Sequence, residues 1–214
     1  MSLFVVFEGL DGAGTTTQTQ LMVEALRQSD RPAIQTREPS DGPIGVLIRQ
    51  MLSMRVVSRL PQGFEPVNRE SLALLFAADR LDHVQNTVVP ALHEGKVVIS
   101  DRYYASSFVY QGDVDESEHF DVAWVRELNS RARRPDLTIF LEAPVDVCLE
   151  RMGSRAQRDI YETQEKLTRL HGRYAQVMSL LEEAGEPILR LDATQDIGTI
   201  HARCLQEILS HLAD

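Results

Sequence analysis

The sequence is short of lysine, cysteine and long apolar runs. Only Lys96 and Lys166 among its 22 basic residues are lysines, so almost every cation that it can offer a phosphate is a guanidinium. Its two cysteines, Cys148 and Cys204, form no CxxC pair and no metal-ligand spacing, which favours a reducing compartment. No apolar stretch approaches the roughly 18 residues that cross a bilayer. Glu8 interrupts the first apolar stretch early, so we expect no signal peptide and a cytoplasmic protein.

The sequence also has no excess of positive charge. Its formal net charge of −10 argues against a nucleic-acid-binding module, although an acidic protein can still hold a local basic pocket for a phosphate. Its 214 residues suit one α/β domain, and it has no repeat and no linker-like segment. We therefore expect a single domain over residues 1–214, with neither a nucleic-acid polymer nor a membrane as partner.

Short runs of apolar and β-branched residues alternate with helical patterns. Five of these runs read as buried parallel strands, at 3–7, 33–36, 97–100, 137–141 and 188–191. Seven helical patterns separate or follow them, at 15–29, 43–54, 67–94, 120–132, 145–156, 160–184 and 196–213. This alternation predicts an α/β fold with a parallel sheet of about five strands wrapped by helices. The segments 53–66 and 112–119 look least ordered. Cys204 falls on the apolar face of the last helix, which predicts a core residue.

The first predicted strand leads into a glycine-rich turn and then a helix. Gly9, Gly14 and Thr16 match the phosphate-loop pattern G-x-x-x-x-G-K-[ST], in which backbone N–H groups cradle phosphates and the Ser/Thr hydroxyl binds Mg²⁺. A glycine-rich turn without a ligand is the alternative. The candidate residues for binding the phosphates of a nucleotide are Gly9, Gly12, Ala13, Gly14, Thr15, Thr16 and Thr17.

Thr15 occupies the position where the pattern has its lysine, which is the one charged residue of the loop. A unit charge pair at about 4 Å is worth about 4 kcal/mol at an effective dielectric constant near 20. A single arginine finger supplies about 10³- to 10⁵-fold in phosphoryl transfer, so one well-placed guanidinium could offset the loss. The substitution therefore weakens the case for catalysis without excluding it.

Four more segments carry polar residues near the ends of predicted strands or on the long central helix. They are TREP at 36–39, LLFAADR at 74–80, SDRY at 100–103 and YQG at 110–112. Arg37, Arg102 and the phosphate loop all follow strands directly. In an open α/β sheet, ligands bind at the carboxyl ends of the strands, so these residues are expected to meet at one edge.

With these segments in place, the whole chain resembles thymidylate kinases, which phosphorylate dTMP to dTDP with ATP. FEGLDGAG-x-TTQ, TREP, LLFAADR, SDRYYASSFVYQG, RPDLTIFL and LDAT occur in that family in this order. The resemblance implies a P-loop kinase fold with sheet order 2-3-1-4-5, ATP and Mg²⁺ as cofactors, a homodimer and a small lid near 151–160. The departures are Thr15, Ser40-Asp41 where bacterial members commonly have two glycines, and a lid segment that matches no subtype cleanly.

The resemblance assigns one set of residues to the nucleoside of the acceptor. Asp11 would meet the sugar 3′-hydroxyl, Phe76 would stack on thymine and Arg80 would reach the base edge. Tyr110 and Gln111 would line the thymine and deoxyribose pocket, where a tyrosine can exclude a 2′-hydroxyl. Without the resemblance these positions have ordinary interpretations, such as a turn aspartate, a core phenylalanine and a solvated helix arginine.

A second set is assigned to the phosphates and the metal. Arg102 would hold the monophosphate with its planar fork, and Arg37 is a second candidate for that task. Asp101 would lie near Mg²⁺ and the transferring phosphates, with Thr16 as the other metal-binding candidate. The alternative for Asp101 and Arg102 is a structural ion pair at a strand end.

Three arginines of the lid segment are candidates for replacing the missing lysine. Arg155 and Arg158 are the catalytic candidates, and Arg158 is favoured because it precedes the DIYE run. Arg151 is assigned to the binding of ATP. A solvated basic helix end is the alternative for each of them taken singly.

These residues together favour an ATP-dependent dTMP kinase. Another nucleoside or nucleoside monophosphate kinase is one alternative. A protein that binds nucleotides without catalysis is the other, and the absence of the loop lysine supports it.

Overall fold

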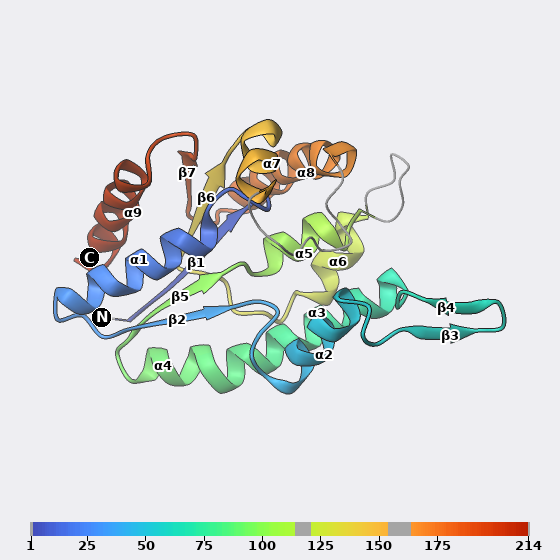
Figure 1. Ribbon diagram of the computed structural model, residues 1–214. Coiled ribbons are helices and arrows are strands. Elements are labelled where there is room, and N and C mark those ends of the chain that lie inside the picture. The colour runs from blue at the N-terminus through green and yellow to red at the C-terminus, as the bar shows by residue number, and fades with distance from the viewer. Residues whose placement is uncertain (1, 114–120, 154–163, 214) are drawn as a thin grey trace.

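The computed structural model describes residues 2–113, 121–153 and 164–213 (Figure 1). Five parallel strands form its main sheet, in the spatial order β2-β5-β1-β6-β7. Numbered along the chain among themselves, they stand in the order 2-3-1-4-5, which confirms the expected topology. Their bounds are β1 (Leu3–Gly9), β2 (Ala33–Arg37), β5 (Val97–Asp101), β6 (Leu137–Glu142) and β7 (Ile188–Asp192).

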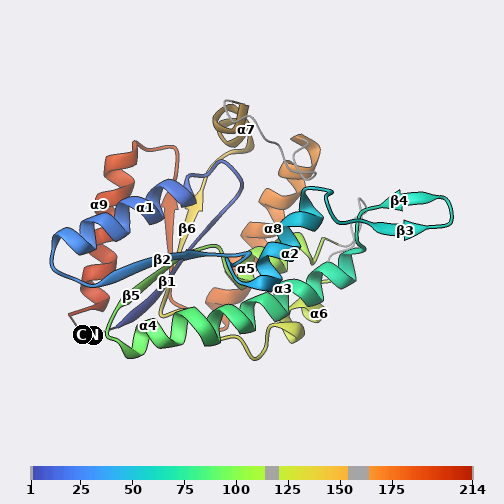
Figure 2. The ribbon, with the colours of Figure 1, turned by 60° about the horizontal axis from the view of Figure 1, so that its bottom comes forward.

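Helices cover both faces of this sheet, which is why the central strands are apolar along their whole length. Every residue of β1 is buried. On one face lie α1 (Thr15–Gln28) and α9 (Ile197–His211), which contact each other (Figure 2). On the other lie α3 (Arg69–His83), α4 (Val89–His93), α5 (Tyr104–Tyr110) and α8 (Gln164–Glu183).

The remaining helices pack around the carboxyl ends of the strands, where the candidate residues lie. They are α2 (Pro43–Leu52), α6 (Val122–Leu128) and α7 (Val145–Gly153). The helix predicted at 67–94 is continuous except for a π-helical turn, η1 (Val84–Val88), between α3 and α4. Pro90 follows this turn and explains it, because proline lacks an N–H and crowds the carbonyl four residues earlier.

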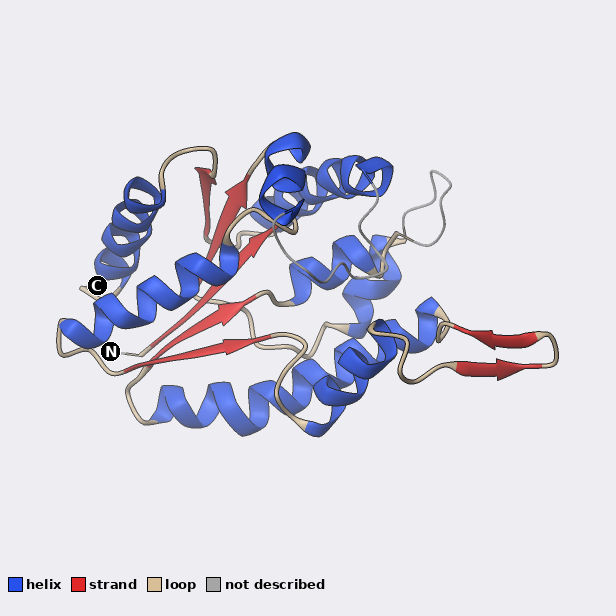
Figure 3. Cartoon of the chain, in the orientation of Figure 1, coloured by secondary structure: helices blue, strands red, loops and turns tan. Residues whose placement is uncertain are grey.

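Two elements differ from the sequence-based expectation. The segment 53–66, expected to be irregular, contains an antiparallel hairpin of β3 (Ser58–Leu60) and β4 (Gly63–Glu65), which projects from the body of the molecule (Figure 3). Helix α5 was not expected at all, because its aromatic and β-branched residues favour a strand when read alone. Most of the other irregular segment, 112–119, lies outside the described residues.

The cysteines behave as the sequence predicts. Both Cys148 and Cys204 are fully buried, and neither is in a disulfide. Burial raises the pKa of Cys148 to about 11 and that of Cys204 to about 12, so both stay protonated near neutral pH. In the described part of the chain, no helix is long and apolar enough to cross a membrane.

Candidate active site

The glycine-rich turn between β1 and α1 has the backbone of an anion-binding loop. Gly12 and Gly14 have φ angles of +89° and +104°, which side chains other than hydrogen rarely allow. A Cβ on Gly12 would lie 2.5 Å from the backbone oxygen of Cys148, so the loop also packs too closely on α7 for any larger residue. Nothing lies within 4 Å of the Cβ position of Gly14, the residue just before α1. Its surroundings leave room for a ligand at the helix N-terminus.

The side chains of Thr15 and Thr16, next to each other at the start of α1, have different surroundings. Thr15 is buried, with 6% of its surface exposed, and a Cβ on Gly9 would lie 3.4 Å from its Cγ2. Thr16 instead donates a hydrogen bond of 2.6 Å from Oγ1 to Oδ2 of Asp101, at the end of β5. The other oxygen of Asp101, Oδ1, is buried without a hydrogen-bond partner in the described part of the chain. A hydroxyl beside an unsatisfied carboxylate oxygen suits Mg²⁺, which binds few protein ligands and completes its shell with water and phosphate oxygens.

A cavity of about 330 Å³ lies against the phosphate loop. It is lined by Gly12, Ala13, Gly14, Thr17, Gln18, Arg151, Gln195, Ile197 and Ile200. Arg151, on α7, donates to the backbone oxygens of Ala193, at 2.8 Å, and Ala13, at 3.4 Å. It therefore holds the phosphate loop next to the turn that follows β7. Arg155 and Arg158, the other two lid candidates, lie outside the described residues.

A second cavity, of about 170 Å³, opens between α3, α5 and the end of β5. Its lining residues are Asp11, Glu38, Pro39, Leu52, Phe76, Arg80, Arg102, Tyr103, Ser106, Ser107, Tyr110 and Gln111. Six of the candidate residues from the sequence are therefore brought together in one place, although they come from four separate segments.

Polar residues from three elements meet at one end of this second cavity. Arg102 forms an ion pair with Asp11 through Nη2 and Oδ1. Tyr110 donates a 3.0 Å hydrogen bond to the other oxygen, Oδ2. Burial, and next to it the charge of Asp11, raises the pKa of Tyr110 above its ordinary value, so its hydroxyl keeps its proton. An arginine, a carboxylate and a neutral phenol are thus available within one small volume.

The backbone of Arg102 is held in an unusual conformation. Its φ angle is +70°, in the left-handed region that is rare for residues other than glycine. Its N–H donates to the backbone oxygen of Phe7 at 2.9 Å, and Ser100 Oγ donates to its carbonyl oxygen at 2.8 Å. Residues of β1 and β5 thus hold the turn that directs the Arg102 side chain into the cavity. Strained backbone of this kind persists where the surrounding structure holds it in place.

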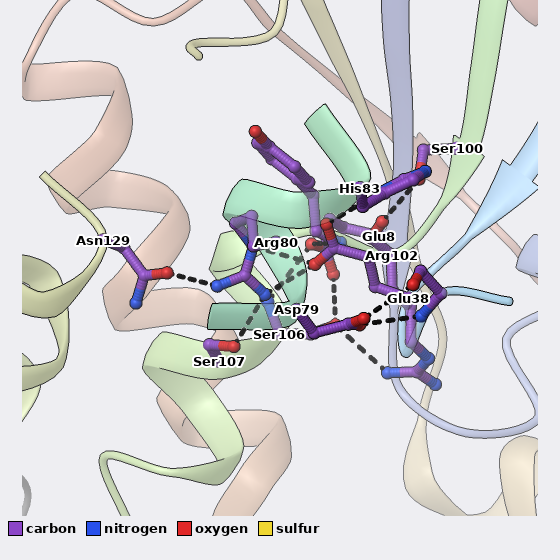
Figure 4. A network of polar contacts seen from close by, with 12 residues as sticks. Glu8, Glu38, Asp79, Arg80, His83, Ser100, Arg102, Ser106, Ser107 and Asn129 are labelled. Carbon is purple, nitrogen blue, oxygen red and sulfur yellow. Dashed lines mark hydrogen bonds and ion pairs between the residues drawn. The ribbon is translucent and has the colours of Figure 1, made fainter. Parts of the chain in front are cut away.

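A buried arginine forms the floor at the other end of the cavity. Arg80 is 1% exposed and lies between Glu38, Asn129 and Ser107 (Figure 4). Its Nε and Nη2 bond to Oε2 of Glu38 at 2.8 and 2.6 Å, and Nη2 also donates to Ser107 Oγ at 2.8 Å. His83 contacts the other oxygen of Glu38 at 3.1 Å. The protein itself therefore occupies most of the hydrogen-bonding capacity of Arg80.

Glu8 is the buried carboxylate closest in sequence to the phosphate loop. It lies at 0% exposure in β1 and receives hydrogen bonds from the backbone N–H groups of Tyr103 and Ser106, at 2.9 and 3.1 Å. Ser106 Oγ donates to it at 2.6 Å, and Tyr174 OH at 3.4 Å. Burial raises its pKa from 4.5 to about 7, against the lowering by Ser106 and by the charge of Arg102.

Comparison with known proteins identifies the family. A family model described as thymidylate kinase matches residues 7–204. A probable thymidylate kinase of Thermococcus gammatolerans is 37% identical over 98% of this chain and 99% of its own. Those of Thermococcus kodakarensis and Methanococcus aeolicus are 34% and 33% identical, over 99% and 98% of this chain and 100% and 97% of their own.

The chain belongs to the thymidylate kinase family. This membership confirms the resemblance that the sequence motifs indicated, and with it the P-loop kinase fold. The individual site residues stay predictions. Asp11, Phe76, Arg80, Arg102, Tyr110 and Gln111 line the second cavity, and Gln111 also has a buried Oε1 without a partner in the described chain.

Arg37 is the candidate that the structure leaves apart. Its side chain is 59% exposed and forms an ion pair of 2.7 Å with Asp41, and it lines neither of the two cavities. Sequence reasoning also missed residues that the structure brings to the site, namely Glu8, Glu38, Ser106, Ser107 and Tyr174. The available signals were the position of Glu8 inside an otherwise apolar strand and the motifs that contain Glu38, Ser106 and Ser107.

The raised pKa of Glu8 predicts a pH dependence of stability. Because the carboxyl takes up its proton more readily when folded than when unfolded, its contribution to stability is complete below about pH 4.5 and is lost as the pH rises to about 7. A shift of this size corresponds to at most about 3 kcal/mol. The amide of Glu8→Gln has no proton to lose in this range. The wild type should therefore lose stability relative to the variant between about pH 4.5 and pH 7, by up to this amount in the free energy of unfolding. Urea unfolding of both proteins between pH 4.5 and 8 measures it, and a difference that does not change with pH contradicts it.

Proposed function

We propose that this protein transfers the γ-phosphoryl group of ATP to dTMP, giving dTDP and ADP. Family membership supports the reaction class, and one structural observation carries the assignment: the phosphate loop and the second cavity meet at Asp101 and Arg102. Asp101 bonds to the loop through Thr16, while the next residue, Arg102, lines the second cavity. A donor at the loop and an acceptor phosphate at Arg102 would therefore face each other.

The chemistry needs charge neutralisation more than proton transfer. The phosphate of dTMP is largely ionised near pH 7, so its oxygen attacks without a strong general base. Arg102 would hold two of its oxygens with a planar fork, and Asp11 would orient the sugar and Arg102 together. Thr16 and Asp101 would hold Mg²⁺, which supplies positive charge to the transferring phosphates.

The lining of the second cavity favours a pyrimidine with a carbonyl at C4. Phe76 offers a ring for stacking. Ser107 Oγ already accepts from Arg80, so its own proton is left to donate. A carbonyl at C4, as in thymine, accepts this proton, whereas the amino group of cytosine could only donate to the remaining lone pair of Ser107 Oγ, which the positive charge of Arg80 makes a poorer acceptor.

An acceptor panel tests the reaction and this selectivity together. ADP release with ATP and Mg²⁺ is measured for dTMP, dUMP, dCMP, dGMP, dAMP and thymidine. We expect the highest kcat/KM with dTMP, and we expect Ser107→Ala to lower it by about tenfold, the worth of one hydrogen bond to a buried polar group, with a smaller effect on dCMP. Faster turnover of thymidine or of another monophosphate supports the alternative kinases instead. Binding of dTMP without turnover of any acceptor supports a non-catalytic nucleotide-binding protein.

We also propose that an arginine of the lid segment supplies the charge that Thr15 lacks. Arg158 is the first candidate and Arg155 the second, while Arg151 already lies beside the phosphate loop and would bind ATP. A guanidinium that reaches the transferring phosphate from a lid can act as an arginine finger does.

Arg158→Ala tests this assignment. Because an arginine finger contributes about 10³-fold or more, we expect kcat to fall by that factor. Arg131→Ala, which removes an exposed arginine near the end of α6, is the matched control and should leave kcat unchanged. Turnover of Arg158→Ala within tenfold of the wild type rules out Arg158 as the replacement for the lysine.

The expected homodimer has one observation in its support. Leu74 and Leu81, seven residues apart on α3, are 53% and 42% exposed, and Val46 on the adjoining α2 is 41% exposed. Such an apolar stripe is suited to contact between copies. Light scattering at micromolar concentration should give about twice the mass of 24.1 kDa, and Leu74→Glu should give the monomer mass. A monomeric wild type contradicts the proposal.

A further inference from the structure

Glu8 is surrounded by hydrogen-bond donors from α5, from α8 and from the residue before α5. Its four partners are the N–H groups of Tyr103 and Ser106 and the hydroxyls of Ser106 and Tyr174, and all four can donate. An ionised carboxylate only accepts, so it receives the two N–H groups and the Ser106 hydroxyl, while the Tyr174 hydroxyl lies 3.4 Å from Glu8 and 3.0 Å from Ser106 Oγ. An amide at this place would instead donate to these hydroxyls, which would then turn their protons toward the guanidinium of Arg102.

Two of these partners connect Glu8 to Arg102. Arg102 Nη1 donates to Ser106 Oγ at 3.2 Å and to Tyr174 OH at 3.2 Å. The Ser106 hydroxyl gives its proton to Glu8 and presents lone pairs to the guanidinium, and the Tyr174 hydroxyl, 3.0 Å from Ser106 Oγ, also accepts from the guanidinium. Glu8 and Arg102 appear together in the network of Figure 4, with Ser106 between them in the bonding order.

The other two partners place Glu8 at the start of α5. Tyr103, the residue before the helix, makes no side-chain hydrogen bond that caps it. Oε1 of Glu8 instead accepts from the N–H groups of Tyr103 and Ser106, which the helix itself cannot satisfy. Glu8 therefore caps α5 from a neighbouring strand, and α5 carries Ser106 and Tyr110, both of which contact Arg102 or its partner Asp11.

We propose that Glu8 is a positioning residue for the acceptor phosphate, acting through the Ser106 and Tyr174 hydroxyls to fix the guanidinium of Arg102. This inference rests on the proposed function for what Arg102 binds. It assigns Glu8 a task in acceptor binding alone, because its hydrogen bonds run to α5, α8 and the Arg102 turn and not to the cavity that the phosphate loop lines.

Glu8→Gln gives the first test, since the amide is the same size but carries a donor and no charge. We expect KM for dTMP to rise about tenfold, the equivalent of one hydrogen bond to a charged group, with KM for ATP within twofold and kcat within threefold of wild type. Asp113→Asn is the matched control. Asp113 is also buried, at 2% exposure, and accepts from Arg169, so its isosteric change should leave KM for dTMP within twofold. A rise of both KM values in Glu8→Gln, or of neither, overturns the proposal.

A mutant cycle separates positioning from general destabilisation. If Glu8 acts through the two hydroxyls, Glu8→Gln should raise KM for dTMP less than twofold in a Ser106→Ala/Tyr174→Phe background. The same tenfold factor in both backgrounds overturns the proposal. Should Glu8→Gln fail to fold, the two hydroxyl variants decide alone: each should raise KM for dTMP at least threefold without changing that for ATP, and no rise overturns it.

A measurement without substrate keeps this inference distinct from the proposed function. The ¹⁵N relaxation of the Arg102 Nε–H group reports how rigidly the guanidinium is held in the ligand-free protein. We expect a lower order parameter in Glu8→Gln and an unchanged one in Asp113→Asn. An unchanged value in Glu8→Gln overturns the positioning task even where dTMP turns over. If the wild type turns over no dTMP, the proposed function fails, and the relaxation result still decides whether Glu8 fixes Arg102.

Discussion

The site depends on how one arginine is held at the end of a buried strand. Arg102 leaves β5 with a left-handed backbone, which a hydrogen bond to Phe7 and another from Ser100 maintain. Its side chain then meets Asp11 from the phosphate loop. Because β1 and β5 are paired in parallel, the loop and this arginine must meet at the same edge of the sheet. The fold therefore sets the distance between the phosphate loop and Arg102.

The second cavity is lined by two arginines, whereas the phosphate loop has no charged residue at its lysine position. The buried Thr15 hydroxyl replaces a lysine, whereas Arg80 and Arg102 are both close to the second cavity. Most hydrogen bonds of Arg80 go to Glu38, Asn129 and Ser107, so its charge is largely balanced within the protein and less of it is left for a ligand. If the proposed function holds, positive charge for the ATP phosphates has to come from a residue other than Thr15, and Arg158 and Arg155 are the candidates that the sequence offers.

The sequence predicted the sheet well because its strands are buried on both faces. All five strand predictions fall within the observed strands, and their order followed from the resemblance. Prediction failed for α5, whose aromatic and β-branched residues favour a strand and whose N-terminus is capped by Glu8, nearly a hundred residues earlier. A cap that comes from another strand leaves no local signal.

The candidate site was predicted only in part, because some of its residues are recognisable from local sequence and others are not. Residues in contiguous motifs, such as Asp11 and Arg102, could be named from the sequence. Glu38 and Ser107 lie in the quoted motifs, but their contacts with Arg80 are made across the fold and gave no reason to single them out, and Tyr174 lies in no motif at all. Arg37 shows the converse, since it sits in a motif yet its exposed side chain pairs with Asp41.

Phosphoryl transfer to dTMP by a phosphate loop without its lysine can be observed directly. Phosphorus NMR of one sample containing the protein, ATP, Mg²⁺ and dTMP follows every phosphate at once. We expect the γ-phosphate signal of ATP to decline while the signals of ADP and of the β-phosphate of dTDP grow in equal amounts. Growth of inorganic phosphate in place of dTDP, or no change in the spectrum while dTMP is bound, would contradict it.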